Sequence, residues 1–149
     1  MKNFDPDFIG RLITMSAHRM AYFITRSLQA NNYSITHEQL VILKIIHCHE
    51  GISQKELAEK LDRDKTSIAR SINLLESDHK VVRVNLKEDK RINSLYLTKD
   101  GKKLCEELEP IFDNIKNDIQ EGFTPEEIST IVSFLKKITN RITELESKL

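Results

Sequence analysis

Apolar residues recur at helical spacing along several stretches of the chain. Over residues 5–30 they lie near one stripe, which predicts an amphipathic helix ended by the turn-forming residues 29–34. The run LVILKII at 40–46 is apolar on nearly every side, so a buried central helix is expected there. The sequence THEQ at 36–39 is a capping box, which marks the start of this second helix.

Two short helices are predicted next, joined by a turn of three or four residues. The capping box SQKE at 53–56 opens the first, and the second begins near Asp64. Two helices joined so tightly are typical of a helix-turn-helix. On a helical wheel, the apolar residues of the second helix form one edge, which we expect to be buried; they are Ile68, Ile72 and Leu75.

The opposite face of that helix carries Thr66, Arg70, Asn73 and Ser77 and no acidic residue. A solvated face more often mixes both signs of charge. These side chains suit hydrogen bonds to base edges and phosphates, with Arg pairing guanine and Asn pairing adenine. An ordinary polar surface is the alternative interpretation.

A β-hairpin is predicted directly after this helix. Val82, Val84 and Leu86 alternate with polar residues, as do Asn93, Leu95 and Leu97. The loop between them contains KEDKR at 87–91, which places three cations at the tip, and Thr98 is expected to cap the next helix. A hairpin in this position is the wing of a winged helix-turn-helix, which reaches the DNA backbone and the minor groove.

The C-terminal segment has a different organisation. TPEE at 124–127 marks a helix start, and residues 99–121 form another apolar stripe. From Ile128 onwards, apolar residues recur at alternating spacings of three and four, which is a heptad pattern. Such a seam needs a facing surface, so we expect a dimer built from both termini. The residues expected in the interface are Phe8, Leu12, Ile128, Ile131, Leu135, Ile138, Ile142 and Leu145.

Charge and composition restrict the class of protein. The formal net charge is zero, but residues 63–91 carry 8 basic and 5 acidic side chains. The longest apolar run, MAYFI at 20–24, is far too short to cross a bilayer, so no membrane association and a cytoplasmic location are expected. The two cysteines match no CxxC spacing, which fits a reducing compartment.

The segment from Ile52 to Leu104 resembles the DNA-binding core of the MarR (multiple antibiotic resistance regulator) family. EDKRINSLYLTKDG at 88–101 is similar to the wing motif of that family: Asp, one residue, Arg, then Leu-Thr and Gly. The resemblance implies a homodimeric transcription regulator that binds pseudo-palindromic operator DNA. One departure is SDHKVVRV at 77–84, where the family usually has a Gly, so His79 or Lys80 must take that turn.

By the same resemblance, residues of the second short helix would contact the major groove and Arg91 the minor groove, while Asp89 would brace the wing arginine. The fold expected is mainly α with a small β-hairpin wing. Residues 1–149 would form a single MarR-type domain, with the winged helix-turn-helix at 36–98 and a helical dimerisation region at 1–35 and 99–149. The residues expected to contact DNA are Ser53, Gln54, Lys55, Lys65, Thr66, Ser67, Arg70, Asn73, Lys87, Lys90 and Arg91.

Other functions were weighed against this one. HCHEG at 47–51 offers metal-ligand types, but consecutive helical residues point about 100° apart, so a helix end near Gly51 is the better interpretation. Neither a metal, a cofactor nor an enzymatic activity is predicted, because no nucleophile with a base and no phosphate-binding loop is present. A redox sensor using Cys48 or Cys105 and a dimeric protein-binding scaffold are the alternatives.

A small aromatic or anionic ligand is a further implication of the resemblance. Such a ligand would bind between the dimerisation region and the winged region. His18 and Tyr22 lie one turn apart on the first helix and would offer polar groups in an apolar pocket. The simpler interpretation makes both ordinary interface residues.

Overall fold

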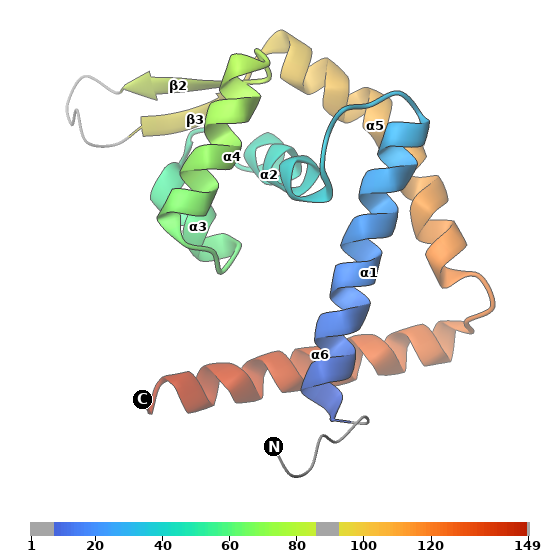
Figure 1. Ribbon diagram of the computed structural model, residues 1–149. Coiled ribbons are helices and arrows are strands. Elements are labelled where there is room, and N and C mark those ends of the chain that lie inside the picture. The colour runs from blue at the N-terminus through green and yellow to red at the C-terminus, as the bar shows by residue number, and fades with distance from the viewer. Residues whose placement is uncertain (1–7, 86–92, 149) are drawn as a thin grey trace, which may run out of the picture. The chain divides into compact units, whose positions relative to one another are not determined.

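The computed structural model describes residues 8–85 and 93–148, which form six helices and three short strands within those ranges (Figure 1). This confirms a mainly α fold with a small β-hairpin. In chain order the elements are α1 (Ile9–Ala30), α2 (His37–Cys48), β1 (Ile52–Ser53), α3 (Gln54–Lys60), α4 (Lys65–Ser77), β2 (Val81–Asn85), β3 (Asn93–Leu97), α5 (Lys99–Gln120) and α6 (Pro125–Glu146).

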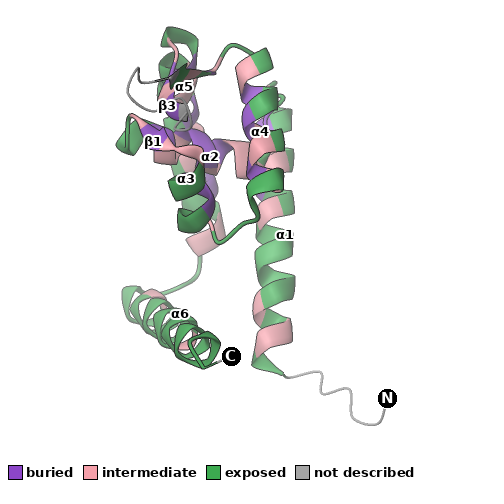
Figure 2. Cartoon of the chain, turned by 90° about the vertical axis from the view of Figure 1, so that its left-hand side faces the viewer, coloured by how far each residue is buried: buried purple, intermediate pink, exposed green. Residues whose placement is uncertain are grey.

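The chain divides into two compact units, Met1–Phe112 and Asp113–Leu149. The first unit contains the helix pair α3 and α4, the three strands and most of the buried residues. Its core is built around α2, where Leu40, Ile42, Leu43 and Ile46 are at most 1% exposed, as the apolar run predicted (Figure 2). The C-terminal part of α1 is anchored in this unit through Ile24 and Leu28, which are also buried.

The predicted helix starts are confirmed by hydrogen bonds. Thr36, Ser53 and Thr124 each accept a bond from the backbone three residues later, and each N3 side chain bonds back to the cap. At α3, the bond from the Ser53 backbone N–H to Glu56 (2.8 Å) is the main cause that lowers the pKa of the Glu56 carboxyl. Local capping boxes therefore mark the N-termini of α2, α3 and α6, and at α2 the Thr25 hydroxyl of α1 also accepts from the His37 N–H (3.0 Å).

The sheet has the order β1-β3-β2, with both pairs antiparallel. The hairpin was predicted, whereas β1 was not, because two residues are too few to show an alternating pattern. In β2 the apolar alternation identifies the strand but lies on its outer face: Val82 and Val84 are 40% and 39% exposed. Val81 is buried and Arg83 is half-buried, so these two residues face the interior.

The turn after α4 replaces the expected glycine with a left-handed residue. His79 has φ +57°, which confirms one of the two residues proposed for this turn. The backbone N–H groups of His79 and Lys80 bond back to Glu76 O (3.0 Å) and Leu75 O (2.8 Å) and close the end of the helix.

The Leu-Thr and Gly part of the wing motif has a structural purpose here. The Thr98 hydroxyl donates to His79 O (2.6 Å) and accepts from the Gly101 N–H (3.0 Å), so Thr98 caps α5 as predicted. The backbone N–H of Thr98 donates to Lys80 O (3.1 Å). A Cβ on Gly101 would lie 2.0 Å from that same Lys80 oxygen. Only glycine therefore lets α5 begin this close to the turn after α4.

In the second unit, α6 has no buried residue. Its heptad positions Ile131, Leu135, Ile142 and Leu145 are 43% to 50% exposed. None of the helices in the described ranges is long and apolar enough to span a membrane.

The short distance between Gly101 and the Lys80 oxygen predicts that replacing this helical glycine with alanine lowers the free energy of unfolding. In a helix, Gly→Ala normally stabilises by roughly 0.5–1 kcal/mol. Gly101→Ala should instead destabilise by about 3 kcal/mol, because the new Cβ would lie 2.0 Å from a backbone oxygen, that of Lys80, which is also hydrogen-bonded to the Thr98 N–H. Urea unfolding would measure the difference.

The matched control is Gly10→Ala, which lies in the first turn of α1 and meets only the exposed side chain of Phe8. That variant should be neutral or slightly more stable. Equal effects of the two substitutions would contradict the packing described at Lys80.

Candidate nucleic-acid interface

The helix pair α3 and α4 is held rigidly on the core of the first unit. Its turn uses Asp62 in a left-handed conformation (φ +49°), and the Arg63 N–H bonds back to Ala58 O (3.0 Å). Asp64 then caps α4 by accepting from the Ser67 N–H (2.8 Å). The inner faces of both helices are buried through Leu57, Ala58, Ile68, Ile72 and Leu75, which confirms the predicted buried edge.

Opposite that edge, α4 exposes Lys65, Thr66, Arg70 and Asn73, while Ser67 is half-buried near the N-cap. No acidic side chain lies among them. The face is thus fixed in orientation by burial on one side and presents cations and hydrogen-bond donors on the other. Such a surface is suited to phosphates and base edges.

The three residues at the start of α3 that are expected to contact DNA also have local structural surroundings of their own. Ser53 is the N-cap, with its hydroxyl accepting from the Glu56 N–H (3.2 Å). Gln54 is half-buried in the first turn. Lys55 pairs with Glu59 at 3.7 Å, but both side chains are more than 60% exposed, so the pair contributes little to stability. The Lys55 ammonium therefore stays available to another anion.

The wing joins this surface at its base. Strands β2 and β3 are paired from Val81↔Leu97 to Asn85↔Asn93, beside α4 (Figure 1). The predicted tip residues Lys87, Asp89, Lys90 and Arg91 lie outside the described residues.

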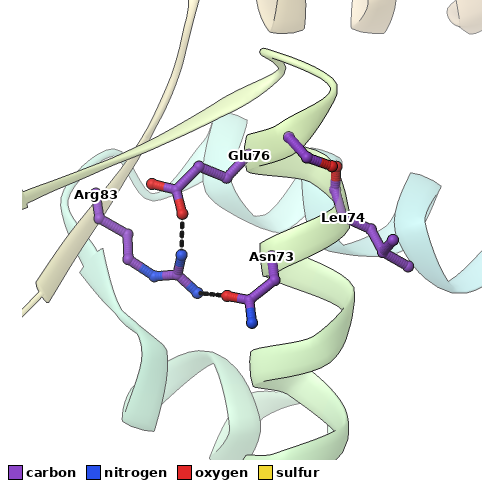
Figure 3. Close-up of polar contacts among 5 residues, drawn as sticks. Asn73, Leu74, Glu76 and Arg83 are labelled. Carbon is purple, nitrogen blue, oxygen red and sulfur yellow. Dashed lines mark hydrogen bonds and ion pairs between the residues drawn. The ribbon is translucent and has the colours of Figure 1, made fainter.

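Arg83 is the residue that sequence reasoning missed. From β2 its Nη1 forms an ion pair with Glu76, and its Nη2 donates to Asn73 Oδ1 at 2.6 Å (Figure 3). Both partners are on α4, so this one side chain ties the base of the wing to that helix. The signal available in the sequence was a single charged residue between Val82 and Val84, on the face of the strand opposite to theirs.

The remaining candidate residues are placed elsewhere. His18 and Tyr22 are exposed on α1, and Tyr22 is 64% exposed. A cavity of about 450 Å³ lies at the C-terminal end of α4. Residues that line it include Tyr33, Gln39, Asp78 and Lys80, and neither His18 nor Tyr22 is among its lining residues.

Cys48 and Cys105 line a second cavity of about 270 Å³ between α2 and α5, together with Lys44 and His47. Cys48 is exposed and Cys105 is half-buried. Burial raises the pKa of the Cys105 thiol, which outweighs the opposite effect of Lys44. The HCHEG segment ends α2 at Cys48, with Gly51 in a left-handed turn (φ +84°), as the helix-end interpretation predicted. Within the described ranges, His, Cys, Asp and Glu form no group of three or more that could hold a metal ion.

Known proteins share this arrangement. The model of the MarR family matches residues 35–92, which include α2, the helix pair and the first hairpin strand β2, and end just before β3. A curated relative is the uncharacterized HTH-type transcriptional regulator YybA of Bacillus subtilis (strain 168), 29% identical over 116 residues that cover 78% of this chain and 77% of YybA.

Two solved structures extend the similarity to most of the chain. A mutant MarR from E. coli, complexed with operator DNA, is 27% identical with a TM-score of 0.80, covering 87% of this chain and 92% of that one. An S. aureus MepR–DNA complex is 25% identical with a TM-score of 0.81, covering 90% and 98%. Since MarR proteins are transcriptional regulators and not enzymes, the prediction that the chain has no enzymatic activity is confirmed. The fold, the motif at the wing base and these relatives agree that the chain resembles the transcriptional regulators of the MarR family, whose model matches its DNA-binding region.

Proposed function

We propose that the protein is a repressor that binds a pseudo-palindromic operator as a homodimer, with α4 in the major groove and the wing along the backbone and minor groove. The observation that carries this proposal is the outer face of α4, which bears Lys65, Thr66, Arg70 and Asn73 without an acidic side chain. The operator DNA bound by the MarR relative and the DNA bound by the MepR relative support it. Because the proposed target is genomic DNA, the proposed location is the cytoplasm.

At the edge of this surface, Ser53, Gln54 and Lys55 are proposed to contact phosphates, whereas Ser67 is proposed to contact the major groove with the rest of α4. The hairpin tip is proposed to supply further contacts. Lys87 and Lys90 would meet the backbone, and Arg91 the minor groove, where Arg is favoured when the groove is narrow. Asp89 would brace Arg91.

The homodimer is proposed to form through apolar side chains of both termini. Support comes from the large apolar residues that α1 and α6 leave exposed. Phe8 is 60% exposed and Leu12 46%. On α6, Phe134 is 59% exposed and lies beside the heptad positions. Ile128 and Ile138 are half-buried and occupy two further positions of the same heptad spacing. An exposed apolar stripe of this length is unfavourable in water and is suited to a second copy of the chain.

Release from DNA is proposed to follow binding of a small aromatic or anionic ligand. His18 and Tyr22, exposed on α1, remain one proposed location. The cavity at the end of α4 is the other. Tyr33 and Lys80 line it together with the carboxylates of Asp78 and Glu107, so an aromatic ligand suits it better than an anionic one. A ligand there would contact the turn that joins α4 to β2 and could alter the angle between helix and wing.

Arg70 tests the role of the helix. The test DNA is a set of duplexes that the parent protein selects from fragmented genomic DNA. Arg70→Ala should weaken binding to them by roughly 1–3 kcal/mol and should reduce the difference in affinity between these duplexes and random DNA. Fluorescence anisotropy at several salt concentrations would measure both. Arg26→Ala removes an exposed cation from α1 and should have little effect. Loss of affinity in Arg26→Ala but not in Arg70→Ala would place the DNA surface elsewhere.

Leu135 tests the dimer. Leu135→Asp should shift the protein from dimer to monomer in sedimentation at micromolar concentration, since an unpaired carboxylate would be buried in the seam. DNA affinity should fall with it, because a monomer reaches only one half-site. Asn140→Asp, at an exposed position on the face of α6 opposite the heptad residues, is the control and should remain dimeric. A Leu135→Asp dimer with full affinity would refute the proposed interface.

Regulation by cysteine oxidation is the rival mechanism. The raised pKa of Cys105 speaks against a sensing role for that cysteine, because thiolates, not thiols, react with peroxides. Replacing Cys48 and Cys105 together with Ser should leave DNA binding unchanged, before and after treatment with hydrogen peroxide. A peroxide response that is present in the parent and absent from the double variant would support the redox sensor instead.

A further inference from the structure

Arg83 contacts two side chains of α4 from the base of the wing. Its guanidinium is ion-paired with Glu76 and donates from Nη2 to Asn73 Oδ1 at 2.6 Å (Figure 3). The Arg83 side chain is only 19% exposed, whereas Asn73 is exposed on the proposed DNA-binding face. A shielded residue of β2 therefore holds an exposed residue of α4.

The chemistry of the guanidinium decides how the Asn73 amide is turned. Arginine has five N–H donors and no acceptor, so only the amide oxygen of Asn73 can face it. Nδ2 has no hydrogen-bond partner among the described residues. With its oxygen directed at β2, Asn73 presents its N–H donors and not its full amide edge to anything that approaches α4.

This orientation changes which base Asn73 suits. Bidentate pairing with adenine needs the oxygen to accept from N6 and the nitrogen to donate to N7, with both amide atoms directed at one base edge. Guanine offers only acceptors there, N7 and O6, and thymine offers O4. An amide that presents donors alone matches guanine or thymine and leaves the N6 donor of adenine without a partner.

Glu76 makes the arrangement stable. It lies one turn after Asn73 on α4, and its carboxylate balances the charge of Arg83. A planar guanidinium forms two bonds in a fixed fork, which a single ammonium would not reproduce. Because the charge of Arg83 is balanced and both of its partners lie on one helix, we expect it to remain bonded to Asn73 when a DNA phosphate is nearby.

We propose that Arg83 is a positioning residue that sets the base preference of Asn73, so that α4 selects guanine or thymine rather than adenine at the base that Asn73 reads. This inference rests on the proposed function, in which α4 enters the major groove. It also replaces the adenine pairing that the sequence alone favours for Asn73.

The test is selection from a randomised duplex pool by the full-length protein and its variants. Asn73→Ala identifies the base position that Asn73 reads, since the preference there should disappear. In the parent this position should be guanine or thymine. In the double variant Glu76→Gln/Arg83→Met, which keeps the net charge, the released amide should favour adenine, with a change in relative affinity on the order of tenfold.

Two further variants separate this effect from charge and from folding. Glu76→Gln alone removes the carboxylate charge but keeps an acceptor oxygen for the Arg83 guanidinium, so Arg83 should stay on Asn73 and the base preference of the parent should be retained. Arg83→Lys keeps the positive charge but lacks the two-pronged guanidinium, so it should lose the base preference of the parent. It replaces the double variant if thermal unfolding shows that the double variant is misfolded.

The outcomes distinguish the inference from the proposed function. Enrichment of no sequence by the parent would refute both. A parent that selects a sequence but prefers adenine at the Asn73 position would overturn the inference alone. The inference alone is also overturned if Asn73→Ala leaves the selected base unchanged at every position. It is likewise overturned if the folded double variant, or Arg83→Lys, keeps the base preference of the parent at the Asn73 position.

Discussion

The backbone oxygen of Lys80 is the point on which the first unit depends, because α4, β2 and α5 all meet there. It accepts from the Thr98 N–H, and Gly101 approaches it more closely than any side chain would allow. The end of α4 is closed one residue earlier by His79 in its left-handed conformation. Moving this oxygen would change the angle between the proposed recognition helix and the wing, together with the start of α5. The motif that identifies the family at this point is therefore a packing constraint rather than a DNA contact.

Charge is arranged so that a chain of zero net charge presents a donor-rich surface. Three carboxylates on or beside α4 are used internally: Asp64 caps the helix, Glu76 pairs with Arg83, and Glu38 accepts from the Ser71 hydroxyl (2.8 Å). None of them lies on the outer face with Arg70 and Asn73. Affinity for the phosphate backbone depends on this local distribution and not on the sum of charges.

Most of the fold could be predicted because its signals are local. The three capping boxes, the apolar run of α2 and the buried edge of α4 each follow from residues a few positions apart. The strand β1 could not be predicted, because Ile52 and Ser53 become a strand only by pairing with Leu95 and Ser94. The inner face of β2 was also hidden, since Val82 and Val84 carry the apolar pattern while Val81 and Arg83 face inward.

By itself the sequence determined the helix boundaries, the hairpin, the family resemblance and the residues of the outer face of α4, because these depend on short-range periodicity, caps and motif spacing. Only the tertiary structure decided that His79 rather than Lys80 takes the left-handed turn, why Gly101 must be glycine, and that Arg83 holds the Asn73 amide by its oxygen. These features depend on atoms brought together from different elements. A pattern along the chain specifies which side chains share a helix face. It does not specify which donor from a distant part of the sequence forms hydrogen bonds with them.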